Sequence, residues 1–171
     1  MKKIKIGING FGRIGRIHAD NILSMQHANL KMIVDPILDS DEELKRRGIQ
    51  QSKNIADLFS LQKIDGVIIC SPSNYHVEQI KELSKATKNI FCEKPLGLSI
   101  KEIMEVKSLV DSKNLNLHIG FNRRFDPDFS SLKSSTSLFV LLSNNCGRIP
   151  TFLVDTRCSV FKFGTNFFTS S

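Results

Sequence analysis

Three glycines near the start of the chain are spaced so that they could hold a phosphate group. Gly10-Phe11-Gly12-Arg13-Ile14-Gly15 lies between an alternating apolar run and a stretch with helical periodicity. In such a strand-to-helix turn the first glycine permits the bend, the second lets the backbone approach a pyrophosphate, and the third allows close packing of the helix. The first helical turn adds free amides and partial positive charge. The backbone of Gly10, Phe11, Gly12, Arg13 and Ile14 is therefore predicted to bind a dinucleotide. A glycine turn with a purely structural role is the alternative.

An acidic residue follows the glycines at the distance that a dinucleotide needs. Asp35 comes 20 positions after Gly15, at the end of a second apolar run, Leu30 to Val34. A carboxylate at this point accepts hydrogen bonds from the ribose hydroxyls of adenosine. It would also repel a 2′-phosphate, so the sequence predicts NAD as the cofactor and makes NADP the less suitable one.

Two further polar segments follow predicted strands. Cys70 to His76 comes after the apolar run that begins at Val67, and Glu93-Lys94-Pro95 comes after Asn89 to Cys92. Ligands of open parallel sheets bind beyond the carboxyl ends of the strands, so both segments are expected to face the nicotinamide. Lys94 could hydrogen-bond a substrate hydroxyl and assist proton transfer, provided that it is buried enough to release its proton.

Each of these segments also has a purely structural interpretation. Ser73 or Asn74 could do no more than cap the helix that follows. Glu-Lys-Pro could be an ordinary surface turn. The residues alone leave both alternatives open.

Short β-type runs alternate with amphipathic stretches up to about residue 120, which predicts an α/β fold with a doubly wound parallel sheet. The expected strands are Ile4–Ile8, Leu30–Val34, Val67–Cys70, Asn89–Cys92 and Leu115–Ile119. The expected helices are Arg13–Ser24, Asp41–Arg47, Asn54–Leu61, His76–Lys85 and one that begins with a capping box at Ser99. In this last helix Ile103, Met104, Val106, Leu109 and Val110 are expected to face a core.

Composition excludes several classes of protein. No apolar run approaches the length of a membrane span, and the alternating residues after Met1 are expected to form a strand and not a secretory leader. The four cysteines are widely spaced, which predicts neither a metal site nor a disulfide framework and favours a cytoplasmic location. The 24 basic residues exceed the 17 acidic ones, but they lie among acids without interleaved aromatics. We therefore expect a solvated surface, with a nucleic-acid face or steering of a phosphate ligand as alternatives.

The composition changes after Lys133. Residues 134–171 are rich in Ser, Thr and Phe, hold Asp155 as their single acid, and show no clear period of a helix or strand. The sequence thus predicts a dinucleotide-binding domain at 1–133 and an irregular tail at 134–171, for which disorder is one interpretation. An edge hairpin and a coding irregularity remain alternatives for the tail.

Two motifs resemble those of a known family. Phe91-Cys92-Glu93-Lys94-Pro95-Leu96 and, downstream, Gly120-Phe121-Asn122-Arg123-Arg124-Phe125-Asp126 are similar to motifs of the Gfo/Idh/MocA oxidoreductases, above all of the inositol 2-dehydrogenase branch. The glycine loop, Asp35 and the Ser-Pro-x-Asn-x-His loop occur in the family's order. The resemblance covers residues 3–133 and implies an NAD-binding Rossmann fold.

The resemblance also implies roles for single residues. It makes Lys94 a catalytic-site lysine that holds a carbinol of a cyclitol or sugar during hydride transfer to NAD. It places Ser71, Asn74, His76, Glu93 and Arg123 around the cofactor or active site. Full-length members of this family are homo-oligomeric.

Family members carry a second domain that supplies a catalytic His and Asp, whereas the recognisable pattern here stops near Lys133. We therefore expect a chain truncated after its Rossmann part. A non-catalytic NAD-binding pseudoenzyme or fragment is the alternative.

A second resemblance competes for the first residues. Lys5 to Arg16 is also similar to the start of glyceraldehyde-3-phosphate dehydrogenase. That family needs a nucleophilic Cys followed by Thr-Thr-Asn, with a His downstream. Here Cys146 is followed by Gly147, and the last histidine is His118. The shared loop therefore indicates a shared cofactor and not a shared reaction.

Overall fold

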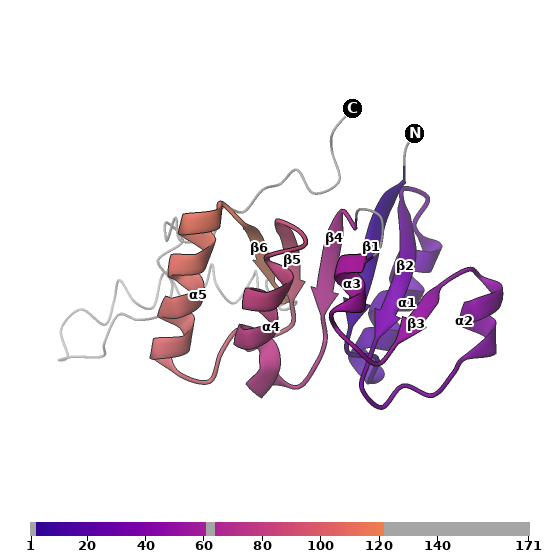
Figure 1. Ribbon diagram of the computed structural model, residues 1–171, viewed down its shortest axis with the longest axis horizontal. Helices are drawn as coiled ribbons and strands as arrows, with labels where there is room; N and C mark the ends of the chain where they lie inside the picture. Colours follow the sequence, from indigo (N-terminus) through magenta and orange to yellow (C-terminus); the bar gives the residue numbers. More distant parts are fainter. Residues whose placement is uncertain (1–2, 61–63, 122–171) are drawn as a thin grey trace, which may run out of the picture. The chain divides into compact units, whose positions relative to one another are not determined.

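A six-stranded parallel sheet forms the centre of the fold (Figure 1). The structure is a computed structural model that describes residues 3–60 and 64–121. The strands are β1 (Ile4–Asn9), β2 (Ala28–Val34), β3 (Gln50–Ser52), β4 (Gly66–Ile69), β5 (Asn89–Cys92) and β6 (Asn116–Ile119). Their order across the sheet is β3-β2-β1-β4-β5-β6, and every neighbouring pair is parallel. The predicted α/β class with a doubly wound parallel sheet is confirmed.

The helices divide between the two faces of this sheet. They are α1 (Arg13–Ser24), α2 (Glu42–Arg46), α3 (Asp57–Ser60), α4 (His76–Leu83) and α5 (Ile100–Lys113), with a 3₁₀ turn at Ser73–Tyr75 before α4. The chain runs outward from β1 to β3, returns to β4, and then runs outward the other way to β6. Because the crossovers are right-handed, this reversal puts α1 and α2 on one face and α3 to α5 on the other (Figure 1). The carboxyl ends of β1 and β4 therefore flank the switch point where such sheets bind ligands.

Each face of the sheet has its own apolar core. On the α1 side, Ile8 and Ile33 have no exposed surface and pack with Ala19 and Ile22. On the other side, Ile69 and the α4, α5 and β5 residues that pack with it form the larger core. Central strands covered on both faces explain the continuous apolar runs that identified them in the sequence.

Helix α5 begins as predicted but packs differently. The Ser99 hydroxyl accepts from the Glu102 amide at 3.2 Å, and the Glu102 carboxylate accepts from the Ser99 amide, so the capping box is confirmed. The expectation that Ile103 and Met104 face a core is wrong, because these side chains are 38% and 54% exposed. On α5 only Val106 and Val110 are buried, and the helix packs mainly against α4.

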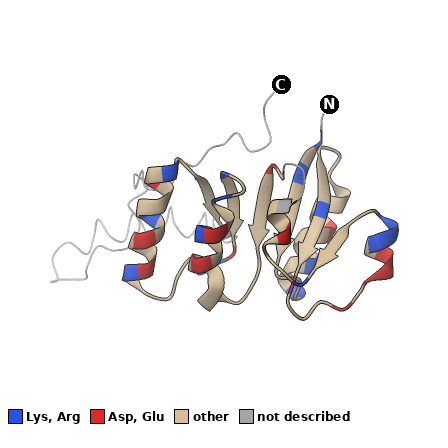
Figure 2. Cartoon of the chain, in the orientation of Figure 1, with Lys and Arg blue, Asp and Glu red and all other residues tan. Residues whose placement is uncertain are grey.

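Charges of both signs alternate along the surface helices. Figure 2 shows Lys and Arg interspersed with Asp and Glu on α2, α4 and α5. Several of these are ion pairs within a helix, such as Lys45–Glu42 and Arg46–Glu43. No helix within the described ranges has the length and hydropathy needed to cross a membrane. The predicted boundary at Lys133 and the tail at 134–171 lie outside the described residues.

Candidate functional site

The glycine loop is shaped by close contact with the loop that follows β4. Gly10 has φ +95°, a conformation that side chains disfavour, and a Cβ there would lie 2.5 Å from the Ser71 amide nitrogen. A Cβ at Gly15 would lie 2.1 Å from the Gly10 carbonyl oxygen. The first and third glycines thus let the loop, helix α1 and strand β4 approach one another, as the sequence predicted for them.

The second glycine faces open space. Gly12 is the N-cap of α1, and a Cβ there would meet no atom of the described residues within 4 Å. Among residues 3–60 and 64–121 no side chain caps the helix, and its first turn holds no acidic residue, so its first amides keep their capacity to donate. An open cradle at an uncapped helix end is the arrangement that a pyrophosphate group fits. The residues present therefore fit a dinucleotide.

Asp35 is held against the glycine loop. Its Oδ2 atom accepts from the Phe11 amide at 2.6 Å, and its Oδ1 atom accepts from the Ile37 amide at 3.0 Å. A carboxylate has about four lone-pair positions, so both oxygens retain capacity for ribose hydroxyls. Asp35 therefore shapes the glycine loop, a contact that the sequence did not predict.

A cavity of about 500 Å³ opens beside Asp35. The Arg16 guanidinium lies over the Phe11 ring, 4.5 Å from the ring centroid, and both residues line this cavity. The rest of the rim is mainly acidic and polar, formed by Gly12, Asp35, Ile37, Leu38, Asp39, Ser40, Asp41 and Glu42. This volume lies in the usual range for small-ligand sites.

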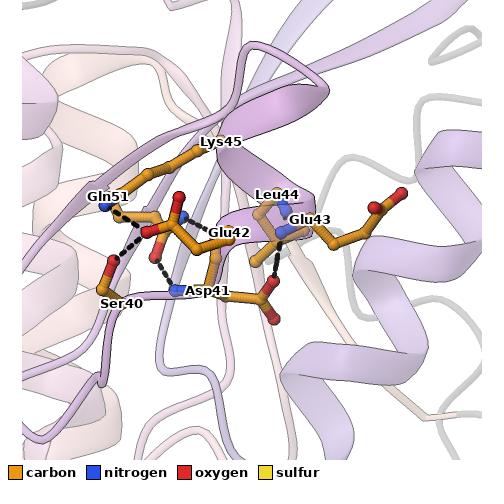
Figure 3. Close-up of polar contacts among 7 residues, drawn as sticks. All are labelled: Ser40, Asp41, Glu42, Glu43, Leu44, Lys45 and Gln51. Carbon is orange, nitrogen blue, oxygen red and sulfur yellow. Dashed lines mark hydrogen bonds and ion pairs between the residues drawn. The ribbon is translucent and has the colours of Figure 1, made fainter.

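Gln51 holds the backbone of Asp41, one of the residues that line this cavity (Figure 3). Its Oε1 atom accepts from the Asp41 amide at 2.9 Å, and its Nε2 atom donates to the Asp41 carbonyl oxygen at 2.7 Å. The Asp41 side chain in turn caps α2 by accepting from the Glu43 and Leu44 amides. Strand β3, which contributes Gln51, was not predicted. Its sequence, Gln50-Gln51-Ser52, has no apolar run from which a strand could be predicted. Only its pairing with β2 identifies it as a strand.

The loop after β4 is built around a buried histidine. His76 has no exposed surface, its Nδ1 atom lies 2.7 Å from the Pro95 carbonyl oxygen, and its Nε2 atom lies 2.8 Å from the Ser71 carbonyl oxygen. Its ring therefore joins the two loops that follow β4 and β5. The Ser71 hydroxyl is hydrogen-bonded to Gln79 of α4.

Helix α4 begins without a side-chain cap. Its N-cap position is Tyr75, so the alternative in which Ser73 or Asn74 caps α4 is wrong. Asn74 is exposed at the carboxyl edge of the sheet instead.

Glu93 and Lys94 lie side by side at the end of β5 but differ in surroundings. The Glu93 carboxylate accepts from the Lys94 amide at 3.3 Å and contacts His18 of α1. Lys94 is exposed, and its peptide bond to Pro95 is cis. The burial that proton release from Lys94 called for is not provided by the described residues.

Two thiols behind this loop are unreactive. Burial and the nearby Glu93 carboxylate raise the pKa of Cys70 to about 12. Burial and the charges of Cys70 and Glu93 raise the pKa of Cys92 to about 12 as well. Neither thiol is ionised near neutral pH, so neither can act as the nucleophile that thiol catalysis needs. Cys146 and Arg123, two other residues weighed from the sequence, lie outside the described residues.

The part of the chain that the structure describes brings most predicted site residues to one edge of the sheet. The glycine loop, Asp35, Ser71, Asn74, Glu93 and Lys94 all follow carboxyl ends of strands. No cluster of three or more His, Cys, Asp or Glu suited to a metal ion occurs among residues 3–60 and 64–121. Gln51 and His18 are the contributors that the sequence reasoning missed.

Comparison with known proteins agrees with this geometry. Residues 4–121 match the model of the Gfo/Idh/MocA group, described as an oxidoreductase family with an NAD-binding Rossmann fold. The chain is 39% identical to an uncharacterized oxidoreductase of Bacillus subtilis over 137 residues and 37% identical to the myo-inositol 2-dehydrogenase of Thermotoga maritima over 134 residues. These alignments cover 78% and 77% of this chain and 40% of each relative.

A solved structure shows the same similarity. The scyllo-inositol dehydrogenase of Lactobacillus casei, solved with bound NAD(H) and scyllo-inositol, superposes with a TM-score of 0.69 at 36% identity. The superposition covers 80% of this chain and 42% of that one. The chain thus spans about 40% of the length of the relatives that it matches.

Proposed function

Because this chain belongs to the Gfo/Idh/MocA oxidoreductase family, we propose that it binds NAD and forms the cofactor-binding part of a dehydrogenase. The proposed reaction is hydride transfer between NAD and a ring carbinol of a cyclitol or sugar. The observation that carries the proposal is the open cradle at Gly12, with Asp35 presented beside it. The named relatives that act on inositols support the substrate class.

Each site residue has a defined task in this proposal. The amides at the start of α1 hold the pyrophosphate, and Asp35 accepts from the adenosine ribose. When bound, NAD supplies the hydride acceptor. Lys94 is exposed at the carboxyl edge, where its amine can donate to the substrate hydroxyl and keep that group oriented. Ser71 and Glu93 order the loops on which these groups stand, and Asn74 is available at the same edge.

Cofactor preference provides one test. Asp35→Asn removes the charge that opposes a 2′-phosphate, so we expect the NADPH-to-NADH affinity ratio to rise about tenfold, measured by fluorescence titration. One of the two amides that Asp35 pairs would face an NH₂ group, which costs about 1–3 kcal/mol of folding stability.

Asp39→Asn is the matched control for this change. It removes the same charge from the rim of the same cavity, and Asp39 has no hydrogen bond to the glycine loop in the described part of the chain. We expect a much smaller change in the affinity ratio. An equal change in both variants would contradict the role given to Asp35 and leave only a general effect of charge.

Turnover provides the second test. The full 171-residue chain is incubated with NAD and either myo-inositol or scyllo-inositol while NADH absorbance is followed. If the chain is active, Lys94→Ala should lower kcat by about a hundredfold or more, because the group that orients the hydroxyl is lost. NADH affinity should change little, since Lys94 contacts substrate and not the nucleotide in this proposal.

The same preparation distinguishes the alternative function. Saturable NADH binding without turnover would favour a nucleotide-binding chain that is not itself catalytic. Absence of NADH binding by a folded chain at millimolar cofactor would contradict the proposed function as a whole.

A further inference from the structure

The Glu93 carboxylate lies where four elements of the site meet. Its residue directly follows β5, and its backbone amide donates to the Ile69 carbonyl oxygen of β4 at 2.9 Å. One carboxylate oxygen lies 2.9 Å from His18 Nε2 on α1. A Cβ built at Gly120, just after β6, would lie 3.0 Å from both carboxylate oxygens. The Glu93 side chain thus contacts α1, the helix that follows the glycine loop, and lies beside the ends of β5 and β6.

His18 has two contacts that fix its own position. Its ring meets the Phe91 ring edge-on, with centroids 5.3 Å apart and an interplanar angle of 63°. Its Nε2 atom is thereby directed at Glu93, where the two side chains are 22% and 21% exposed. Phe91 lies in β5 and Glu93 directly follows it. The two contacts of His18 therefore connect α1 to the end of β5, although β4 lies between β1 and β5 in the sheet.

Two described thiols near Glu93 carry no charge at neutral pH. Cys70 and Cys92 lie near enough for the carboxylate to raise their pKa values, and both thiols stay protonated. The second carboxylate oxygen accepts from the Lys94 amide at 3.3 Å. The carboxylate therefore links the histidine on the cofactor helix to the backbone of the residue that carries the exposed amine.

We propose that His18 is a positioning residue, which orients the Glu93 carboxylate and through it sets Lys94 relative to the nicotinamide end of the site. The inference rests on the proposed function for the presence of a nicotinamide, whereas the contact between His18 and Glu93 is seen in the structure itself. A partly exposed pair of this kind contributes little to global stability. A displacement of about 1 Å in a reacting group can cost a hundredfold in rate. The pair is thus better suited to placing a group than to holding the fold together.

Two variants isolate the contact. His18→Phe keeps an aromatic ring against Phe91 and removes the nitrogen that faces Glu93. His18→Gln restores a nitrogen donor on a side chain of similar reach and serves as the rescue variant. If His18→Phe does not fold, His18→Asn takes its place, because its amide is too short to reach Glu93.

The first measurement needs no cofactor. Hydrogen exchange of the Lys94 and Gly120 amides is compared in wild type and His18→Phe, with amides of β2 as internal reference. We expect about tenfold faster exchange at Lys94 and Gly120, no change in β2, and recovery in His18→Gln, because only local order is lost. Unchanged exchange at both amides would overturn the proposal.

The second measurement separates the two halves of the dinucleotide. NADH and ADP-ribose share the adenosine and pyrophosphate, and only NADH carries nicotinamide. His18→Phe frees the backbone of the whole loop after β5, which faces the nicotinamide, and not the Lys94 amine alone. It should therefore weaken NADH binding about fivefold to tenfold, which Lys94→Ala does not, and ADP-ribose binding less than about twofold. Equal weakening of both ligands, or of neither, would overturn the positioning role. If wild type binds neither ligand, the proposed function fails, while the exchange measurement still decides whether His18 orders the loop.

Discussion

Gly12→Val is expected to abolish NADH binding while leaving the chain as stable as wild type. Within the described part of the chain a Cβ at Gly12 meets no atom within 4 Å, and the backbone there, at φ −70° and ψ −164°, suits any residue. The added carbons would occupy the space through which a pyrophosphate approaches the α1 amides. We expect the Kd for NADH to rise by about a hundredfold or more, which corresponds to roughly 3 kcal/mol. Titration calorimetry measures the Kd for NADH, and thermal unfolding measures the stability of the variant.

Gly12→Ala provides the graded control for this prediction. Its single methyl group fills less of the cradle, so its affinity should fall between those of wild type and Gly12→Val. NADH binding by Gly12→Val at wild-type affinity would place the ligand elsewhere. A large loss of stability would instead show that Gly12 is structural, which was the alternative weighed for the glycine turn.

Gly15→Ala should have the opposite pattern, a large loss of stability. The new methyl carbon would lie 2.1 Å from the Gly10 carbonyl oxygen, which is backbone and cannot rotate away. Helix α1 must move off the sheet to make room. We expect the free energy of unfolding to fall by about 3 kcal/mol, or Tm by roughly 10 °C, because overpacking is relieved only by backbone shifts.

Gly48→Ala is the comparison that separates sterics from backbone conformation. Gly48 has φ +74°, but a Cβ there meets nothing within 4 Å, so its cost is about 1–2 kcal/mol of conformational strain alone. If Gly15→Ala were no more destabilising than Gly48→Ala, the close packing assigned to the third glycine would be contradicted.

Apolar periodicity located the buried elements because central parallel strands are covered on both faces. Helix α1 spans Arg13–Ser24 and strand β5 spans Asn89–Cys92, both as predicted. Strand β2 ends at Val34 as predicted but begins two residues earlier, at Ala28. Strand β3 was missed because Gln50-Gln51-Ser52 is polar and pairs with only β2, at the edge of the sheet. Periodicity shows which residues share a helix face, but it does not show how much of that face other elements cover. For this reason Met104 was predicted to face a core.

The candidate site was predicted in part for a similar reason. Motifs fix which residues follow strand ends, so the glycine loop and Asp35 could be placed before the structure was known. The Gln51–Asp41 clamp and the His18–Glu93 contact join segments distant in sequence, and no local pattern encodes them. His76 had a motif position, but its burial between two carbonyl oxygens depends on how the loops after β4 and β5 fold together.

The contact of Gly10 with the Cys70–Ser71 backbone also determines when the cradle can form during biosynthesis. Strand β1 is flanked by β2, which follows it closely, and by β4, which is translated much later. A nascent chain that has released only β1, α1 and β2 lacks the backbone against which Gly10 rests. Such non-local closure requires the intervening segment to be looped out first, at an entropic cost. We therefore expect the glycine loop to take its final shape only after Ser71 has emerged from the exit tunnel.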